Sequence, residues 1–81
     1  MVFPMFEDVI VTTDVPGHDV RSGDVGTVVE HHVVAGKEDG YSVEFFSVNG
    51  ETRAVVTLPA SRLRQAKPGT PLTSRAPSHV D

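Results

Sequence analysis

The stretch that decides the fold is YSVEFFSVNGETRAVVTL, residues 41–58. Two runs rich in β-branched and aromatic residues flank Asn49 and Gly50. This pair is typical of a two-residue type I′ hairpin, because both residues tolerate the positive φ that the turn requires. A two-residue loop fixes the register, so we predict that Phe46 faces Arg53. The sequence therefore predicts an antiparallel hairpin with Asn49 and Gly50 as its structural turn.

The alternation of side chains along a strand divides this predicted hairpin into two faces. One face is expected to be the core: Tyr41, Val43, Phe45, Ala54, Val56 and Leu58. The other face is mixed and supplies the predicted interaction surface: Phe46, Val48, Arg53 and Val55. There the Arg53 guanidinium is expected to lie over the Phe46 ring. Either the N-terminal segment Phe3-Pro4-Met5-Phe6 covers this surface, which is favoured because large exposed apolar clusters are rare, or a partner does.

The rest of the chain body reads as further short strands. Residues 7–13 and 24–34 predict two strands before the hairpin, and residues 64–66 predict a short closing strand. Residues 59–63 are too few for an α-helix and predict a single 3-10 turn. No segment shows a sustained helical period. The sequence thus predicts an all-β fold, a small SH3-like five-stranded barrel with one 3-10 turn before the last strand.

Gly26 interrupts the second predicted strand, and a glycine inside a strand marks a bulge or a sharp bend. Val25 and Val28 cannot share one side of a strand under strict alternation. A structural turn at Gly26 is therefore predicted to direct both valines inward. The alternative, that Gly26 lets a ligand approach the backbone, is less favoured.

The length and composition of the chain bound its organisation. With 81 residues it forms one small domain, because two independent cores need a longer chain. Residues 1–66 are predicted to be the SH3-like barrel, and residues 67–81, with three of the six prolines, a disordered Pro-rich tail. The chain has no apolar run near the ~20 residues that span a membrane and no basic start typical of a secretory signal. We expect a cytoplasmic protein without membrane contact.

The charge of the chain disfavours nucleic acid as a partner. Eleven Asp and Glu stand against seven Lys and Arg, a net charge of −4. Affinity for phosphates depends on clustered cations, and the only local cluster is Arg53, Arg62 and Arg64. A nucleic-acid-binding SH3-like module remains the alternative that these arginines would support.

The histidines do not form a metal site in the predicted fold. His31 and His32 are adjacent on a strand, so their side chains point to opposite faces. His18 belongs to a loop and His79 to the tail, and the chain has no cysteine. Without further ligands at a known spacing, no metal and no cofactor is predicted.

Asp14, His18 and Asp19, with Ser22 nearby, resemble an acid–base group or a weak cation site. The favoured interpretation is structural: Asp14 and Asp19 form turns, and Asp24 caps the loop. Hydrolytic catalysis also needs a pocket and an oxyanion hole, for which a small filled barrel has little room. We predict that the protein is not an enzyme.

Several segments together carry a resemblance to a known family: Gly17–Glu30, Tyr41–Phe45, Asn49–Thr52 and Val55–Leu58. On these the chain resembles a family of small bacterial proteins, domain-of-unknown-function family 4926, over about residues 5–65. The resemblance implies a compact SH3-like β domain. It implies no established activity and carries over no catalytic residues.

A weaker resemblance joins the chain to the SH3-like domain of the nitrile hydratase β subunit. Pro16-Gly17-His18, Gly26-Thr27-Val28 and Tyr41–Phe45 occur there in similar order. This implies a packing module or an accessory protein of a nitrile-hydratase-type enzyme. Catalysis in that family rests on cysteine ligands of the other subunit, and this chain has no cysteine.

The leading functional hypothesis is a non-enzymatic protein-interaction or accessory module with an acidic surface. It is expected to be antitoxin-like or homo-oligomeric, so the partner is an unknown protein or a second copy. Small size, excess acid and the apolar stripe of Phe46, Val48 and Val55 motivate this hypothesis.

Overall fold

The computed structural model describes residues 2–67, 69 and 74–75. Its elements, in chain order, are β1 (Asp8–Val11), β2 (Val25–His32), β3 (Gly40–Ser47), β4 (Thr52–Pro59), the 3-10 helix η1 (Ala60–Arg62), β5 (Leu63–Gln65) and β6 (Ser74–Arg75). Strands β1 to β5 form one antiparallel sheet in the order β4-β3-β2-β1-β5, and β6 pairs in parallel with β3. The predicted all-β fold of five strands, with a 3-10 turn before the fifth, is confirmed.

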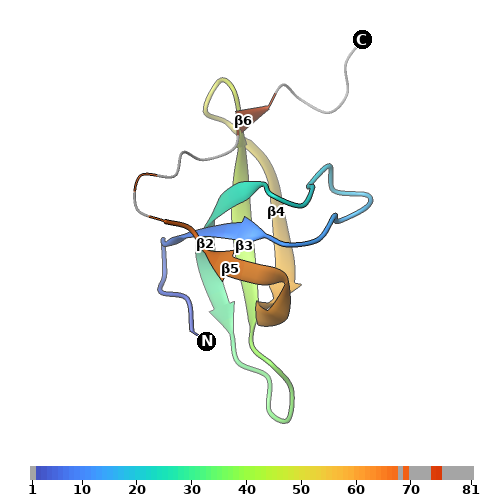
Figure 1. Ribbon diagram of the computed structural model, residues 1–81, viewed down its shortest axis with the longest axis vertical. Helices are drawn as coiled ribbons and strands as arrows, with labels where there is room; N and C mark the ends of the chain where they lie inside the picture. The colour runs from blue at the N-terminus through green and yellow to red at the C-terminus, as the bar shows by residue number, and fades with distance from the viewer. Residues whose placement is uncertain (1, 68, 70–73, 76–81) are drawn as a thin grey trace.

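The β3–β4 hairpin runs along the longest dimension of the molecule, 44 Å, and β1 and β5 cross in front of it (Figure 1). This crossing turns the inner faces of β1 and β5 toward β3 and β4. β4 and β5 lie at the two ends of the strand order. The more specific likeness to an SH3 domain stays a prediction.

Alternating side chains of the strands meet in one hydrophobic core. Its buried members are Phe3, Val9, Val11, Val20, Val28, Tyr41, Val43, Phe45, Val56, Leu58 and Leu63, with Ala54 packed against them. The predicted core face of the hairpin is therefore confirmed. Filling the interior with large rings and β-branched side chains supplies most of the apolar burial that holds the sheet together.

The hairpin turn differs from the predicted type I′ turn. The Gly50 amide donates to the Ser47 carbonyl (3.0 Å) and the Ser47 amide donates to the Glu51 carbonyl (2.9 Å), so the loop has three residues, not two. Only Gly50 of the loop has positive φ, +85°, while the Asn49 side chain accepts a hydrogen bond from the Glu51 amide (3.2 Å). Three-residue loops that end on a left-handed glycine are the next most common hairpin connection.

The longer loop changes the register at the end of the hairpin. Phe45 pairs with Ala54 as predicted, but Phe46 pairs with Thr52, and the intervening Arg53 forms a bulge. The predicted pair of Phe46 and Arg53 is therefore wrong. Because an extra residue in one strand reverses the alternation of faces, the Arg53 side chain turns inward.

Gly26 brings β2 close to β3. A Cβ on Gly26 would lie 2.6 Å from Val43 Cγ1 and 2.8 Å from the Glu44 carbonyl oxygen. Alternation continues through this glycine: Val28 joins the core, while Val25 pairs with Ile10 and stays outside the core cluster. Both valines are buried, as predicted, but only Val28 packs within the central core cluster. The register shift lies later in β2, between Val28 and Glu30.

The N-terminal segment differs from the prediction that it packs on the outer face of the hairpin. Phe3 does not cover the outer face of the hairpin but enters the core, where its ring meets Tyr41 edge to face at 5.2 Å. Ser74 and Arg75, within the predicted disordered tail, form β6 against β3. Most of that tail, His79 included, lies outside the described residues. Within the described part of the chain, no helix has the length and apolar character needed to cross a membrane.

Candidate functional site

Three of the four residues of the predicted interaction surface are exposed or half-buried along the β3–β4 hairpin and its loop. Val48, in the loop, is 68% exposed, and Val55, on β4, is 52% exposed. Phe46, on β3, is half-buried. We call these three residues the hairpin surface. Arg53 does not belong to it, because its side chain is only 4% exposed and points to the other face.

Arg53 instead connects the hairpin to the long loop between β1 and β2. Its Nη1 donates to the Asp19 backbone carbonyl and lies 3.3 Å from Asp19 Oδ2, and its Nη2 lies 3.9 Å from Asp24 Oδ2. The guanidinium also lies over the Phe45 ring, 5.9 Å from its centroid. The arrangement pairs a buried cation with two carboxylates, which is the compensation that a buried charge requires.

The backbone of the loop holds both carboxylates in place. Asp24 Oδ2 accepts a hydrogen bond from the Arg21 amide (2.9 Å), so this side chain caps the loop as predicted. Asp19 adopts a φ of +54°, a conformation that aspartate tolerates better than most residues. A bridge between Val15 and Val20 closes the loop tip. The sequence shows that these residues are charged but not that they meet, because Asp19 and Arg53 are 34 positions apart.

The predicted acid–base residues do not converge. Asp14 Oδ1 accepts a hydrogen bond from the Ser22 amide (2.8 Å), and the Ser22 hydroxyl donates to the Thr12 carbonyl (3.1 Å). Asp19 faces Arg53, and His18 is exposed. The contacts of Asp14 are those of a turn-forming residue.

The side chains of His31 and His32 lie on opposite faces of β2, as predicted. His31 stacks on Tyr41 with 4.5 Å between ring centroids, and its Nε2 is 2.7 Å from Asp39 Oδ2. His32 Nε2 is 2.8 Å from the Ser42 hydroxyl. Among the residues that the structure describes, no three His, Asp or Glu side chains gather as a metal site would require.

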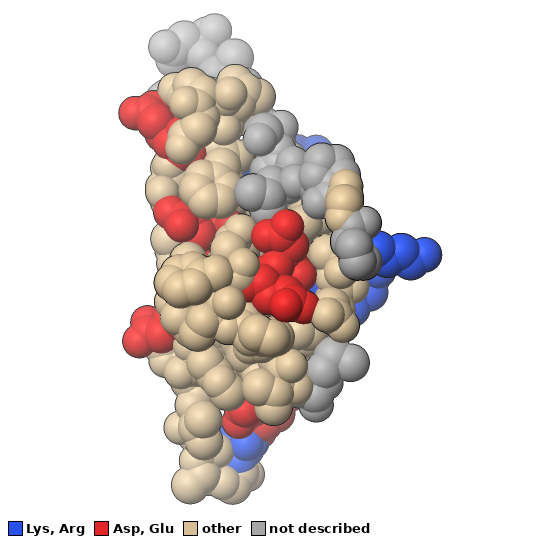
Figure 2. All heavy atoms as spheres, turned by 90° about the vertical axis from the view of Figure 1, so that its left-hand side faces the viewer, with Lys and Arg blue, Asp and Glu red and all other residues tan. Residues whose placement is uncertain are grey.

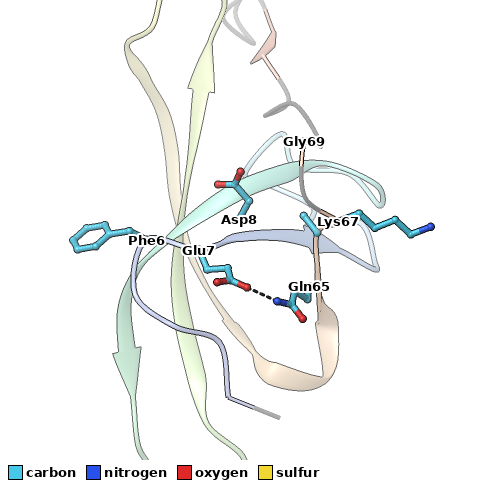
Figure 3. Close-up of a pocket in the computed structure, with 7 residues that line it drawn as sticks. Phe6, Glu7, Asp8, Gln65, Lys67 and Gly69 are labelled. Carbon is cyan, nitrogen blue, oxygen red and sulfur yellow. Dashed lines mark hydrogen bonds between the residues drawn. The ribbon is translucent and has the colours of Figure 1, made fainter.

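An open groove of about 600 Å³, which the sequence did not indicate, lies between the N-terminal turn and β5. It is lined by Phe6, Glu7, Asp8, Gln65, Ala66, Lys67 and Gly69. Gln65 donates a hydrogen bond to Glu7 across the groove, while the Phe6 ring points away from the other labelled residues (Figure 3). Asp8 also accepts a hydrogen bond from the Thr27 hydroxyl (3.2 Å). Three of the polar side chains that line the groove, Glu7, Asp8 and Gln65, thus already have hydrogen-bond partners.

Acidic side chains mark one face of the protein. Figure 2 shows Asp and Glu side chains gathered in the middle of one face, with Lys and Arg at its margin. Arg62 and Arg64 are exposed, but the buried Arg53 does not join them. The arginine cluster predicted as a nucleic-acid footprint is therefore incomplete.

Comparison with known proteins agrees with the resemblance noted from the sequence. No curated protein and no solved structure matches the chain. Residues 5–65, which include β1 to β5 and the group formed by Arg53, Asp19 and Asp24 (the Arg53 cluster), match a family described as "Domain of unknown function (DUF4926)". This match covers more than half of the 81 residues, and the chain belongs to the family DUF4926.

Proposed function

We propose that the chain is a non-catalytic protein-interaction module that binds a protein partner through the hairpin surface. The observation that supports this proposal is the exposure of Val48, 68%, in the loop of the β3–β4 hairpin, and of Val55, 52%, on β4. Burial of apolar area stabilises a complex by about 25 cal/mol per Å² before the costs of association. Two exposed valines and a half-buried aromatic ring on one hairpin give a partner apolar side chains to cover.

The charges around the hairpin surface indicate the chemistry of the partner. Glu51, at the end of the hairpin loop, is exposed, and Glu44, on β3, accepts a hydrogen bond from the Thr52 hydroxyl. The whole chain carries a net charge of −4. Complementary charges at the rim of an interface speed association and select partners. The proposed partner therefore presents apolar side chains surrounded by Lys and Arg.

A non-catalytic role is supported by what the acidic side chains contact. Asp14 and Asp24 accept hydrogen bonds from backbone amides of their own loop, and Asp19 faces Arg53. A general base must be free to accept a proton from a substrate. These carboxylates stabilise the conformation of the loop, which is a structural role and not a catalytic one.

The experiment compares two valine pairs in copurification from cells that naturally produce the protein. A tagged chain with Val48→Ser and Val55→Ser should lose a partner that the unaltered chain retains. Val33 is 77% exposed and lies outside the hairpin, so Val33→Ser is the matched control and should retain the partner. The partner is then identified and titrated against both variants. Equal binding to both variants, or a chain without any partner, would contradict the proposal.

A further inference from the structure

The two edges of the antiparallel sheet are built differently. β5 has only three residues, and its Arg64 and Gln65 are exposed. A short, charged edge strand discourages pairing with another chain. β4, at the opposite edge, has eight residues, and among the described residues no strand pairs with its outer side.

β4 lacks the usual devices that protect an edge. It carries no Asp, Glu or Lys, and its only proline, Pro59, is its last residue. Its single charged side chain, Arg53, is turned inward to Asp19 and Asp24. The bulge at Arg53 disturbs only the start of the strand, so residues 54–59 remain a regular ladder with β3. At about 3.4 Å per residue this leaves roughly 20 Å of unpaired backbone along an uncharged edge.

We infer that β4 pairs with β4 of a second copy of this chain in an antiparallel arrangement. This inference goes beyond the proposed function, because it concerns the backbone edge of β4, whereas the Lys- and Arg-bearing partner is proposed to cover the apolar side chains of the hairpin surface. The new contact is the strand edge itself, where main-chain hydrogen bonds form and Val55 loses its exposure. A two-fold axis satisfies both edges at once and closes the assembly as a dimer.

Charge explains why a second copy fits this edge although the protein is acidic overall. The sequence contains no Asp or Glu between Thr52 and Val80, so ten of its eleven acids precede β4. Two copies can therefore meet along β4 without placing carboxylates of that strand opposite one another. The only charge on either strand, Arg53, is already paired within its own protomer.

The two-fold axis limits the possible registers. Directly opposed residues of an antiparallel pair point to the same face of the sheet. The outward side chains within the regular ladder are Val55 and Thr57. In the registers that pair these outward side chains with one another, Val55 faces its own copy, or Thr57 faces its own copy, or Val55 faces Thr57 of the second copy.

Sedimentation equilibrium at up to about 1 mM protein, the weak end of specific association, tests the dimer. We expect twice the 8.7 kDa of one chain. A lysine on an edge strand blocks pairing, so Val55→Lys and Thr57→Lys should each return the mass to that of one chain, while Val33→Lys should remain dimeric. Circular dichroism shows that the lysine variants are folded. A chain that is monomeric throughout this range would overturn the inference.

Cysteine cross-linking identifies the surface by which the copies meet, since the chain has no cysteine of its own. Opposed Cα atoms about 4.5–5.5 Å apart lie within the ~4.4–6.8 Å that a disulfide spans. A cross-linked dimer is expected in Val55→Cys alone, in Thr57→Cys alone, or only when the two variant proteins are mixed. Each of these results supports the inference and identifies which residues face one another. Val33→Cys and Val48→Cys are controls. A dimer by sedimentation with no disulfide in any β4 variant would show that the copies meet elsewhere and would overturn the inference.

The two proposals fail in distinguishable ways. A monomeric chain that binds a different protein, with loss of binding in the Val48 and Val55 double variant, rejects the β4 dimer and retains the proposed function. A monomeric chain without any partner rejects both. A dimer that Val55→Lys dissociates supports the β4 pairing, and the copurification experiment then decides the proposed function separately.

Discussion

The guanidinium of Arg53 lies over the ring of Phe45 on the neighbouring strand, 5.9 Å from the ring centroid. The bulge in β4 produces this contact, because it turns Arg53 from the outer face of the hairpin to the inner one. From there the side chain reaches Asp19 and Asp24 in the long loop. One residue thus joins the hairpin, the core and the loop.

Replacing Arg53 should destabilise the protein strongly. Arg53→Met keeps an unbranched apolar stem but removes the cation that faces two carboxylates, of which Asp24 is buried. Breaking a buried ion pair from one side costs about 3–5 kcal/mol, and we expect the free energy of unfolding in urea to fall by about 3 kcal/mol. Arg64→Met, at an exposed site, should change it by no more than about 0.5 kcal/mol. Equal effects of the two substitutions would show that the ion pairs of Arg53 do not contribute to the free energy of unfolding.

The backbone packing at Gly26 predicts a second large effect. An added methyl group would lie 2.6 Å from Val43 Cγ1 and 2.8 Å from both the Glu44 carbonyl oxygen and Phe45 Cε1. Because one of these atoms belongs to the backbone, β2 and β3 would have to separate. We expect Gly26→Ala to lower the free energy of unfolding by about 1–3 kcal/mol, measured by thermal and urea denaturation.

Gly40, on β3, provides the matched control for Gly26. An added Cβ there would meet its nearest neighbours at 3.8 Å, an ordinary contact distance, and its φ is not positive. Gly40→Ala should therefore be neutral or slightly stabilising. A Gly26→Ala protein as stable as Gly40→Ala would contradict the close approach of β2 and β3.

Local pattern and long-range contact explain what the sequence could and could not predict. The core face of the hairpin followed from alternation, which each strand sets by itself. Asn49 and Gly50 correctly located the turn but not its length, because the Asn49 side chain bonds to the Glu51 amide and only Gly50 takes positive φ. That one residue of loop length decided the face of Arg53.

The contacts of Arg53 and Phe3 are examples of structure that no local sequence pattern predicts. Arg53 meets Asp19 across 34 positions, and the Phe3 amide meets the Tyr41 hydroxyl across 38. Many other acids in the chain would have been equally acceptable partners for one arginine. The all-β fold was therefore predictable, whereas the buried cluster and the role of the N-terminal segment were not.

The buried hydrogen bond of Tyr41 supports a third prediction. The Tyr41 hydroxyl accepts a hydrogen bond from the Phe3 amide (3.1 Å), and Tyr41 is fully buried. Tyr41→Phe leaves this amide without its acceptor, which costs about 1–3 kcal/mol for a buried group. We expect lower stability, with faster hydrogen exchange at the Phe3 amide than in the unaltered protein. Exchange that is unchanged at Phe3 would show that the N-terminal segment is held by its apolar contacts alone.

Phe6 is the residue whose replacement should stabilise the protein. It has a φ of +62°, in a turn closed by the Glu7 amide donating to the Pro4 carbonyl (3.2 Å). The third position of such a turn favours glycine, and a residue with a Cβ pays about 1–2 kcal/mol to adopt the left-handed conformation. The Phe6 side chain is 72% exposed, so its removal gives up little burial. Phe6→Gly should therefore raise the free energy of unfolding by about 1 kcal/mol, whereas Met5→Gly, one position earlier and without positive φ, should lower it. If Phe6→Gly is less stable than the unaltered chain, the ring contributes more through its contacts than its backbone conformation costs.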